Sequence, residues 1–146
     1  MSVLDIQNKI KSILFLCTGN SCRSQMAEGF AKQILSKNFH IESAGTEAHG
    51  LNPYTVKTMN EIGIDISHHK SKKINNNDVE KFDLVITLCG DARDKCPIVD
   101  KNKHIHWDIP DPANFKGNEP DTKQKYSEVR ELILKNIKRF KEQGEK

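Results

Sequence analysis

Two short, nearly continuous apolar runs mark the clearest strands along the chain. Residues 12–16 (SILFL) and 83–88 (DLVITL) are rich in branched apolar side chains, which is typical of strands buried on both faces of a parallel sheet. Residues 24–35 instead carry apolar side chains at spacings of three and four, and so does the segment from Thr122 to Phe140. These two segments predict amphipathic helices, because that spacing gathers the apolar side chains on one helix face.

Weaker patterns lie between these elements. Residues 39–44 alternate in part between apolar and polar side chains and predict a strand, and residues 104–107 predict a shorter one. Asn52 and Pro53 are typical of an N-cap and a first helical residue, and Gly63 should end that helix. Strands thus alternate with helices. The pattern predicts an α/β fold with a doubly wound, four-stranded parallel sheet in the order 2-1-3-4 and helices on both faces, which binds ligands beyond the carboxyl ends of its strands.

The length and the composition favour one soluble domain. The 146 residues contain no internal repeat and no Pro/Gly/Ser-rich linker, so we expect a single domain over 1–146, with the polar run 75–78 as a surface loop. The 23 Lys and Arg exceed the 20 Asp and Glu by only three, and they are spread along the chain. This charge distribution argues against a surface that binds nucleic acid or an anionic membrane.

The cysteines are the candidate reactive groups. The first ten residues include Asp5 and Lys9 and form no apolar signal region, and no later apolar run is long enough to span a membrane, so we expect a cytoplasmic protein. That compartment is reducing, which disfavours permanent disulfides. The thiols are therefore better interpreted as catalytic, metal-binding or inert, and they are Cys17, Cys22, Cys89 and Cys96.

The loop from Cys17 to Ser24 carries the strongest chemical signal. It lies between the first predicted strand and the first predicted helix, where successive backbone N–H groups and the helix N-terminus form a cradle for a tetrahedral anion. Arg23, six positions after Cys17, is spaced to close the loop around one oxyanion, and the positive surroundings favour a nucleophilic Cys17 thiolate. The predicted oxyanion-binding residues are Thr18, Gly19, Asn20, Ser21, Cys22 and Arg23.

Other interpretations of these residues are weaker. A buried cysteine in a Gly-containing turn is the plainest alternative for Cys17, and a Walker-type nucleotide site lacks its Gly-Lys-Ser/Thr. Cys22 is expected to pack as a small buried hydrophobe, with a secondary oxidation role as the alternative. The cysteine spacings do not form zinc knuckles. Trp107 is expected to anchor the core or a loop, and solvated or supporting side chains are the favoured interpretation of His68, His69, His104 and His106.

Four motifs resemble one known family closely. They are CTGNSCRSQMAEG from Cys17, SAG at 43–45, VITLCGDARDKCP and HWDIPDPA, and they are similar to the thioredoxin-coupled arsenate reductases of the low-molecular-weight phosphatase superfamily. The resemblance runs from Ile13 to Phe140 and includes all four cysteines, whereas residues 1–11 form an N-terminal extension. It implies a phosphatase-like fold, reduction of arsenate to arsenite in arsenic detoxification, and no cofactor.

Two further thiols complete the chemistry that the resemblance implies. Reduction of arsenate takes two electrons, and two thiols that form one disulfide supply them. Cys89 follows the strand 83–88 and belongs at the same sheet edge as Cys17, since the two strands are neighbours in the order 2-1-3-4. Cys96 follows after the segment 90–95, and the Gly-Asp and charged composition of this segment predicts that it is flexible and exposed. Cys89 could therefore pass a disulfide from Cys17 to Cys96.

By resemblance, Cys17 attacks arsenate while Arg23 and the loop amides hold its oxygens, and Asp111 protonates the departing oxygen. Cys89 then attacks Cys17 and releases arsenite, and Cys96 attacks Cys89 to give a disulfide that thioredoxin reduces. Asp111 is preferred to Asp108 as the acid, although Asp-Pro could merely shape a turn. The supporting residues that the resemblance implies are Ser24, which hydrogen-bonds the Cys17 thiolate, and Asn20, which organises the loop.

Relatives of this family can bind potassium beside the loop, and the matching residues here are Asn20, Glu28 and Ser43. Lys72 stands where a further acidic ligand is expected, and its ammonium could occupy the site or repel the cation, which argues against potassium dependence.

Two rival functions remain at this point. A tyrosine phosphatase would use the same cradle and aspartate, but Ala113 stands where an aromatic residue would grip a phenyl ring, so only a weak side activity on aryl phosphates is expected. A redox or oxyanion sensor would oxidise once and stop. The expected partners are arsenate and thioredoxin, with no nucleic acid and no membrane, and the chain is expected to be a monomer.

Overall fold

The computed structural model describes residues 10–35, 37–96 and 101–144. Of the predicted N-terminal extension 1–11, only the last two residues lie within the described ranges. In these described parts no helix is both long enough and apolar enough to cross a membrane.

Four parallel strands form the sheet. They are β1 (Ser12–Cys17), β2 (His40–Gly45), β3 (Leu84–Thr87) and β4 (His104–His106), and they are hydrogen-bonded in the order β2-β1-β3-β4. This confirms the predicted order 2-1-3-4. The central strand β1 is buried from Ile13 to Cys17, as its unbroken apolar run requires.

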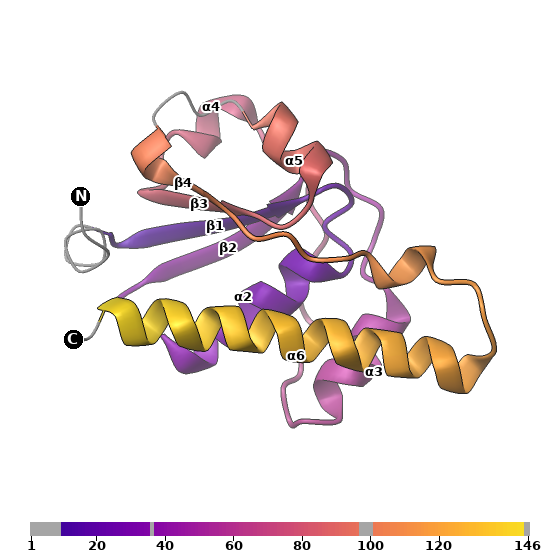
Figure 1. The fold of residues 1–146 in the computed structure, drawn as a ribbon. Helices are drawn as coiled ribbons and strands as arrows, with labels where there is room; N and C mark the ends of the chain where they lie inside the picture. The colour runs from indigo at the N-terminus through magenta and orange to yellow at the C-terminus, as the bar shows by residue number, and fades with distance from the viewer. Residues whose placement is uncertain (1–9, 36, 97–100, 145–146) are drawn as a thin grey trace.

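Helices cover both faces of the sheet, as predicted (Figure 1). One face carries α2 (Arg23–Ile34), α3 (Pro53–Asn60) and the long C-terminal helix α6 (Glu119–Gly144), which contact one another. The other face carries the short helices α4 (Asn76–Val79) and α5 (Gly90–Lys95). Two 3-10 turns, at Lys101–Lys103 and Pro112–Asn114, complete the regular elements of the described residues.

The apolar stripes predicted from spacing form the core between the sheet and these helices. Met26 and Phe30 of α2 are buried against it, together with Ile133 and Ile137 of α6. Asn52 caps α3 by accepting a hydrogen bond from the Tyr54 backbone N–H at 2.8 Å, and its side-chain amide also donates to the hydroxyl of Tyr126 on α6.

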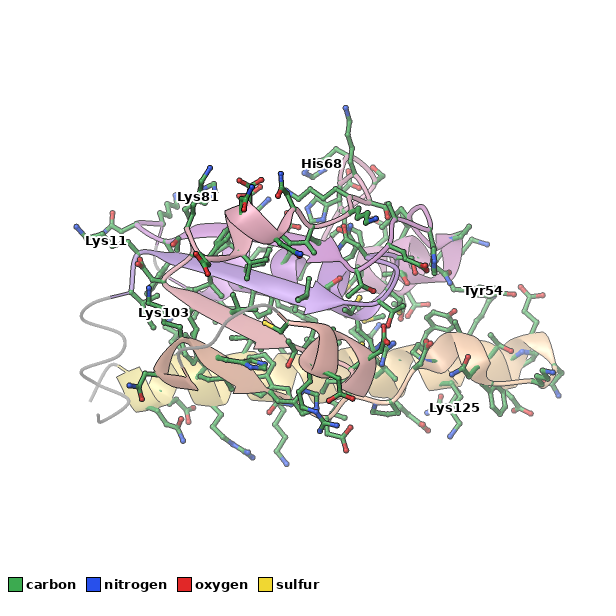
Figure 2. The ribbon with its side chains drawn as sticks, turned by 90° about the horizontal axis from the view of Figure 1, so that it is seen from above. Lys11, Tyr54, His68, Lys81, Lys103 and Lys125 are labelled. Atoms are coloured by element: carbon green, nitrogen blue, oxygen red, sulfur yellow. The ribbon has the colours of Figure 1, made fainter. Side chains whose placement is uncertain are left out.

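Lysine side chains project outward from several elements around the molecule. Lys81, Lys103 and Lys125 are exposed and lie on the α4–β3 loop, before β4 and on α6, respectively (Figure 2). The positive charge is therefore distributed over the surface, in agreement with the pattern along the sequence.

Two predictions for short segments differ from the structure. Residues 76–78 of the predicted surface loop belong to α4, and residues 90–95, predicted to be flexible and exposed, form α5. The Asn75 side chain accepts from the Asn77 backbone N–H and caps α4. At the start of α5 the Cys89 sulfur accepts from the Ala92 N–H at 3.3 Å, and Ala92 itself is fully buried. A capping side chain and one buried alanine thus outweigh the charged composition of residues 90–95. Helix α6 also begins three residues before Thr122.

Gly45, the last residue of β2, lies where three backbone segments meet. A Cβ at this position would lie 2.5 Å from the Thr18 carbonyl oxygen, 2.8 Å from the Asn20 backbone nitrogen and closer still to the Glu47 carbonyl oxygen. Only a glycine allows the loop after β1 to approach β2 this closely.

We expect Gly45→Ala to lower the free energy of unfolding by at least about 2 kcal/mol, since backbone atoms cannot move aside as a flexible side chain can. Urea denaturation followed by circular dichroism measures this. Gly90→Ala is the matched control and should change stability by less than about 1 kcal/mol, because the nearest atom is the end of the Arg93 side chain at 3.5 Å. Equal losses for the two variants would contradict the argument.

Candidate active site

The loop between β1 and α2 is built around Asn20. This residue has a φ of 49°, in the left-handed region that asparagine tolerates better than most residues, and its side chain is fully buried. The amide nitrogen donates to the Ser24 hydroxyl at 2.8 Å and to the Ser43 hydroxyl at 3.0 Å. The amide oxygen accepts from the Lys72 backbone N–H at 2.9 Å and from the Gln25 side chain at 3.1 Å. The loop is thereby fastened to α2, to β2 and to the segment before α4.

Cys17 ends β1 with its sulfur 2.9 Å from the Ser24 hydroxyl oxygen. Because Asn20 donates to that same oxygen, the hydrogen of the Ser24 hydroxyl is left to point at the sulfur. The Ser24 hydroxyl is thus placed to donate a hydrogen bond to the Cys17 sulfur.

Arg23 brings the loop to a segment that is distant in the sequence. It is the first residue of α2, and its guanidinium donates to the Ile109 carbonyl at 3.0 Å and lies 3.5 Å from the Asp111 carboxylate. Asp111 also accepts from the Ala113 backbone N–H at 3.0 Å, which fixes its orientation in the Asp-Pro turn. The structure thus brings the candidate general acid to the edge of the anion-binding loop.

Cys89 reaches the same loop from the neighbouring strand. The backbone N–H of Leu88 donates to the Leu16 carbonyl at 2.9 Å, which sets the carboxyl ends of β1 and β3 side by side. The Cys89 sulfur then lies 3.2 Å from the hydroxyl oxygen of Thr18, the residue after Cys17. Cys96 is half-buried at the opposite end of α5.

Cys22 has a different environment from the other cysteines. It is 4% exposed at the N-cap of α2, and burial raises its pKa to about 12. At neutral pH it is therefore a thiol, which fits the prediction that it packs as a small hydrophobe.

The residues matched to a potassium site form a hydrogen-bonded cluster. The Ser43 hydroxyl donates to the Glu28 carboxylate at 2.5 Å, and the Lys32 ammonium lies 2.6 Å from the same group. Burial lowers the pKa of His69, which lies 3.8 Å from Glu28, and the carboxylate opposes that shift. Lys32 is therefore the cation paired with Glu28 in this structure, and the absence of potassium dependence stays a prediction.

The structure corrects the predicted role of Lys72 in this cluster. Its ammonium forms an ion pair with Glu42, an exposed edge-strand residue, and only its backbone N–H contacts Asn20. The reason is geometric: the segment around Lys72 pairs with the end of β2, since the Gly45 N–H donates to the Lys72 carbonyl.

The histidines and the tryptophan support the fold. His104 and His106 lie on one face of β4 with ring nitrogens 2.9 Å and 2.8 Å from the Thr87 hydroxyl oxygen, and burial lowers the pKa of His104. Trp107 packs against Phe15 with ring centroids 6.1 Å apart. Across the described residues no group of three or more His, Cys, Asp or Glu side chains could hold a metal ion.

Sequence reasoning missed two polar residues of the site. Gln25 is fully buried and donates to Asn20 while its side-chain oxygen contacts the His69 ring. Asp91 accepts from the Thr18 hydroxyl at 3.2 Å. Both residues lie inside the conspicuous motifs CTGNSCRSQ and CGDARDKC, which is the signal that could have identified them.

Comparison with known proteins defines the class. The family model of the low molecular weight phosphotyrosine protein phosphatases matches residues 12–146, and the chain belongs to this family. Within it, the chain is similar to proteins named arsenate reductase: that of Bacillus licheniformis is 54% identical over 92% of this chain and 98% of its own length, and that of Bacillus subtilis is 51% identical over 95% and 99%. A solved arsenate reductase in the phosphate binding state is 31% identical with a TM-score of 0.68, over 89% of this chain and 95% of that one.

The high pKa of Cys22 predicts that its thiol resists alkylation. In a variant that keeps only Cys22, made by replacing the other three cysteines with serine, we expect almost no reaction with iodoacetamide at pH 8 until the protein is unfolded, because the reagent attacks thiolates. Mass spectrometry of the native and the unfolded protein measures this. A variant that keeps only the half-buried Cys96 is the control and should react in the native state. Similar native rates for the two thiols would refute the prediction.

Proposed function

We propose that this chain reduces arsenate to arsenite by a relay of Cys17, Cys89 and Cys96, and that thioredoxin reduces the resulting disulfide. The observation that carries the proposal is the contact of Thr18 with the Cys89 sulfur at 3.2 Å, because it sets a second thiol against the loop that binds the oxyanion. The similarity to arsenate reductases over nearly the whole chain supports the same conclusion.

The first step uses the anion-binding loop. Backbone N–H groups of residues 18–22 and the Arg23 guanidinium bind the arsenate oxygens, while the Cys17 thiolate attacks arsenic. Asp111, 3.5 Å from Arg23, donates a proton to the departing oxygen, which leaves as water. The product is a covalent adduct with a bond between sulfur and arsenic(V).

The second step moves two electrons. The Cys89 thiolate attacks the Cys17 sulfur, a disulfide forms, and the electron pair of the broken sulfur–arsenic bond remains on arsenic, which leaves as arsenite. Cys96 then attacks Cys89 and releases the Cys17 thiol. Two thiols have become one disulfide, which balances the two electrons that arsenic gains.

The third step requires α5 to unwind. Cys89 and Cys96 cap the two ends of this helix, and seven residues at 1.5 Å each separate their Cα atoms by about 10 Å. A disulfide needs Cα atoms no more than about 7 Å apart. Formation of the Cys89–Cys96 bond therefore opens the helix and exposes the disulfide to a dithiol reductant, and thioredoxin in the cytoplasm is the reductant we propose.

Aryl phosphate hydrolysis is a second, weaker candidate function. A hollow of about 570 Å³ lies beside Asp111, lined by Pro110, Asp111, Pro112, Asn114, Phe115, Lys125, Glu128, Val129 and Leu132. Although Ala113 is not aromatic, the Phe115 ring lines this hollow and could contact a phenyl group, with the Lys125 ammonium 5.6 Å from the ring centroid. We infer that a slow phosphatase side activity accompanies the reductase.

The proposed relay predicts that replacement of Cys89 and replacement of Cys96 reduce arsenite release to different extents. With thioredoxin, thioredoxin reductase and NADPH, wild type should oxidise NADPH continuously when arsenate is present and not when phosphate replaces it. Cys96→Ser should still release about one arsenite per enzyme and then stop, because the Cys17–Cys89 disulfide can form. Cys89→Ser should release almost none. Arsenite release and NADPH absorbance measure the two quantities.

Cys22→Ala is the matched control for these variants and should keep multiple turnover. Sustained turnover by Cys89→Ser would refute the relay. If wild type hydrolyses aryl phosphate but consumes no NADPH with arsenate, the chain is a phosphatase and the reductase proposal is wrong.

Replacement of Asp111 should slow the chemical step and leave substrate binding almost unchanged. Asp111→Asn keeps the size of the side chain but removes the proton donor, so kcat for arsenate should fall about 100-fold while KM changes little. Asp108→Asn is the matched control on the same loop, because Asp108 is exposed and lies three residues earlier. Equal effects of the two substitutions in steady-state kinetics would remove Asp111 from the mechanism.

A further inference from the structure

One carboxylate on α5 contacts the loops that follow two different strands. Asp91 Oδ2 accepts from the Thr18 hydroxyl at 3.2 Å and from the Thr46 hydroxyl at 3.4 Å. Thr18 follows β1 and Thr46 follows β2, and the Thr46 hydroxyl is also 3.3 Å from the Thr18 carbonyl oxygen. Asp91 therefore joins α5, which begins at the end of β3, to the carboxyl ends of β1 and β2.

The same hydroxyl of Thr18 faces the second thiol of the relay. Its oxygen lies 3.2 Å from the Cys89 sulfur and 3.2 Å from Asp91, but a hydroxyl has one hydrogen to donate. A carboxylate is the stronger acceptor and carries a charge, so the hydrogen goes to Asp91. The Thr18 oxygen then faces the Cys89 sulfur, so one hydroxyl links the Asp91 carboxylate to the residue that caps α5.

We propose that Asp91 is a positioning residue that holds α5 folded against the anion-binding loop until the Cys89–Cys96 disulfide forms. The proposal rests on the proposed function, since it concerns the second and third thiols of that relay. Asp91 acts through Thr18 and Thr46 and does not contact the reacting sulfur–arsenic bond.

The energetic consequence follows from the geometry of α5. The helix is folded in the dithiol state and must unwind in the Cys89–Cys96 disulfide, so contacts that need a folded α5 exist only in the dithiol state. By linkage, the hydrogen bonds of Asp91 stabilise the dithiol and oppose oxidation. Their removal should shift the equilibrium toward the disulfide.

The experiment measures that equilibrium without arsenate. The full chain carrying Cys17→Ser, so that Cys89 can pair only with Cys96, is equilibrated with mixtures of reduced and oxidised dithiothreitol, and the disulfide fraction is read by mass spectrometry after acid quench and alkylation. Each disulfide formed takes two electrons and two protons from the cysteines and returns them to dithiothreitol, so the equilibrium constant is defined.

Asp91→Asn and Thr46→Val should each raise that constant about three- to tenfold, the size of one or two ordinary hydrogen bonds. Thr46→Val is the decisive variant, because it removes a contact of Asp91 without changing the sequence or the intrinsic stability of α5. The double variant should shift the constant by less than the product of the two single shifts, because both remove the same contact. Asp94→Asn is the control, since it removes an equal charge from α5 at a residue paired with Arg93. It should shift the constant less than twofold.

Two results would overturn the proposal. One is an equal shift for Asp91→Asn and Asp94→Asn, and the other is a shift for Asp91→Asn with none for Thr46→Val, which would mean that Asp91 stabilises only its own helix. Neither result affects the arsenate assays, so the reductase proposal would stand. If the Cys17→Ser protein forms no Cys89–Cys96 disulfide even in oxidised dithiothreitol, the relay itself is wrong and this inference fails with it.

Discussion

The active-site loop depends on the four hydrogen bonds of the Asn20 side chain. This amide is fully buried and has two hydrogens and one oxygen, and each is matched: Ser24 and Ser43 accept, and Lys72 and Gln25 donate. A buried polar group left without a partner costs about 1 to 3 kcal/mol, so the loop has one well-defined arrangement. The direction of the Ser24 hydrogen toward Cys17 follows from that arrangement and not from Ser24 alone.

Helix α5 meets two opposing requirements. In the relay we propose, it holds Cys89 near the loop in the dithiol state and opens when Cys89 bonds to Cys96. Six residues are far too few for a helix that is stable by itself, so its stability comes from its contacts: the Cys89 cap, the buried Ala92 and the hydrogen bonds of Asp91. A segment held by so few contacts is among the least stable parts of a folded protein, so a change in its conformation costs little free energy.

The sequence predicted correctly those features that depend on local patterns of side chains. Continuous apolar runs identified β1 and β3, and the spacing of Cys17 and Arg23 located the anion-binding loop. Composition failed for α5, because a sulfur cap and a single buried alanine leave no periodic signal. The resemblance to the family also gave the wrong place for the Lys72 ammonium, since its pairing with Glu42 depends on which strand the chain lies beside. Pairings of this kind are set by tertiary geometry.

The two cysteines of the loop are expected to differ in reactivity because their environments differ. Cys22 is only five residues from Cys17 and is closer in sequence than Cys89, yet burial raises its pKa to about 12. A thiol in that state is a poor nucleophile at neutral pH, so it does not compete for the sulfur of Cys17. The second thiol of the disulfide must then come from outside the loop, and β3 places the Cys89 sulfur 3.2 Å from the Thr18 hydroxyl oxygen. The order of the strands, rather than proximity along the chain, therefore selects the partner of Cys17 in the reaction we propose.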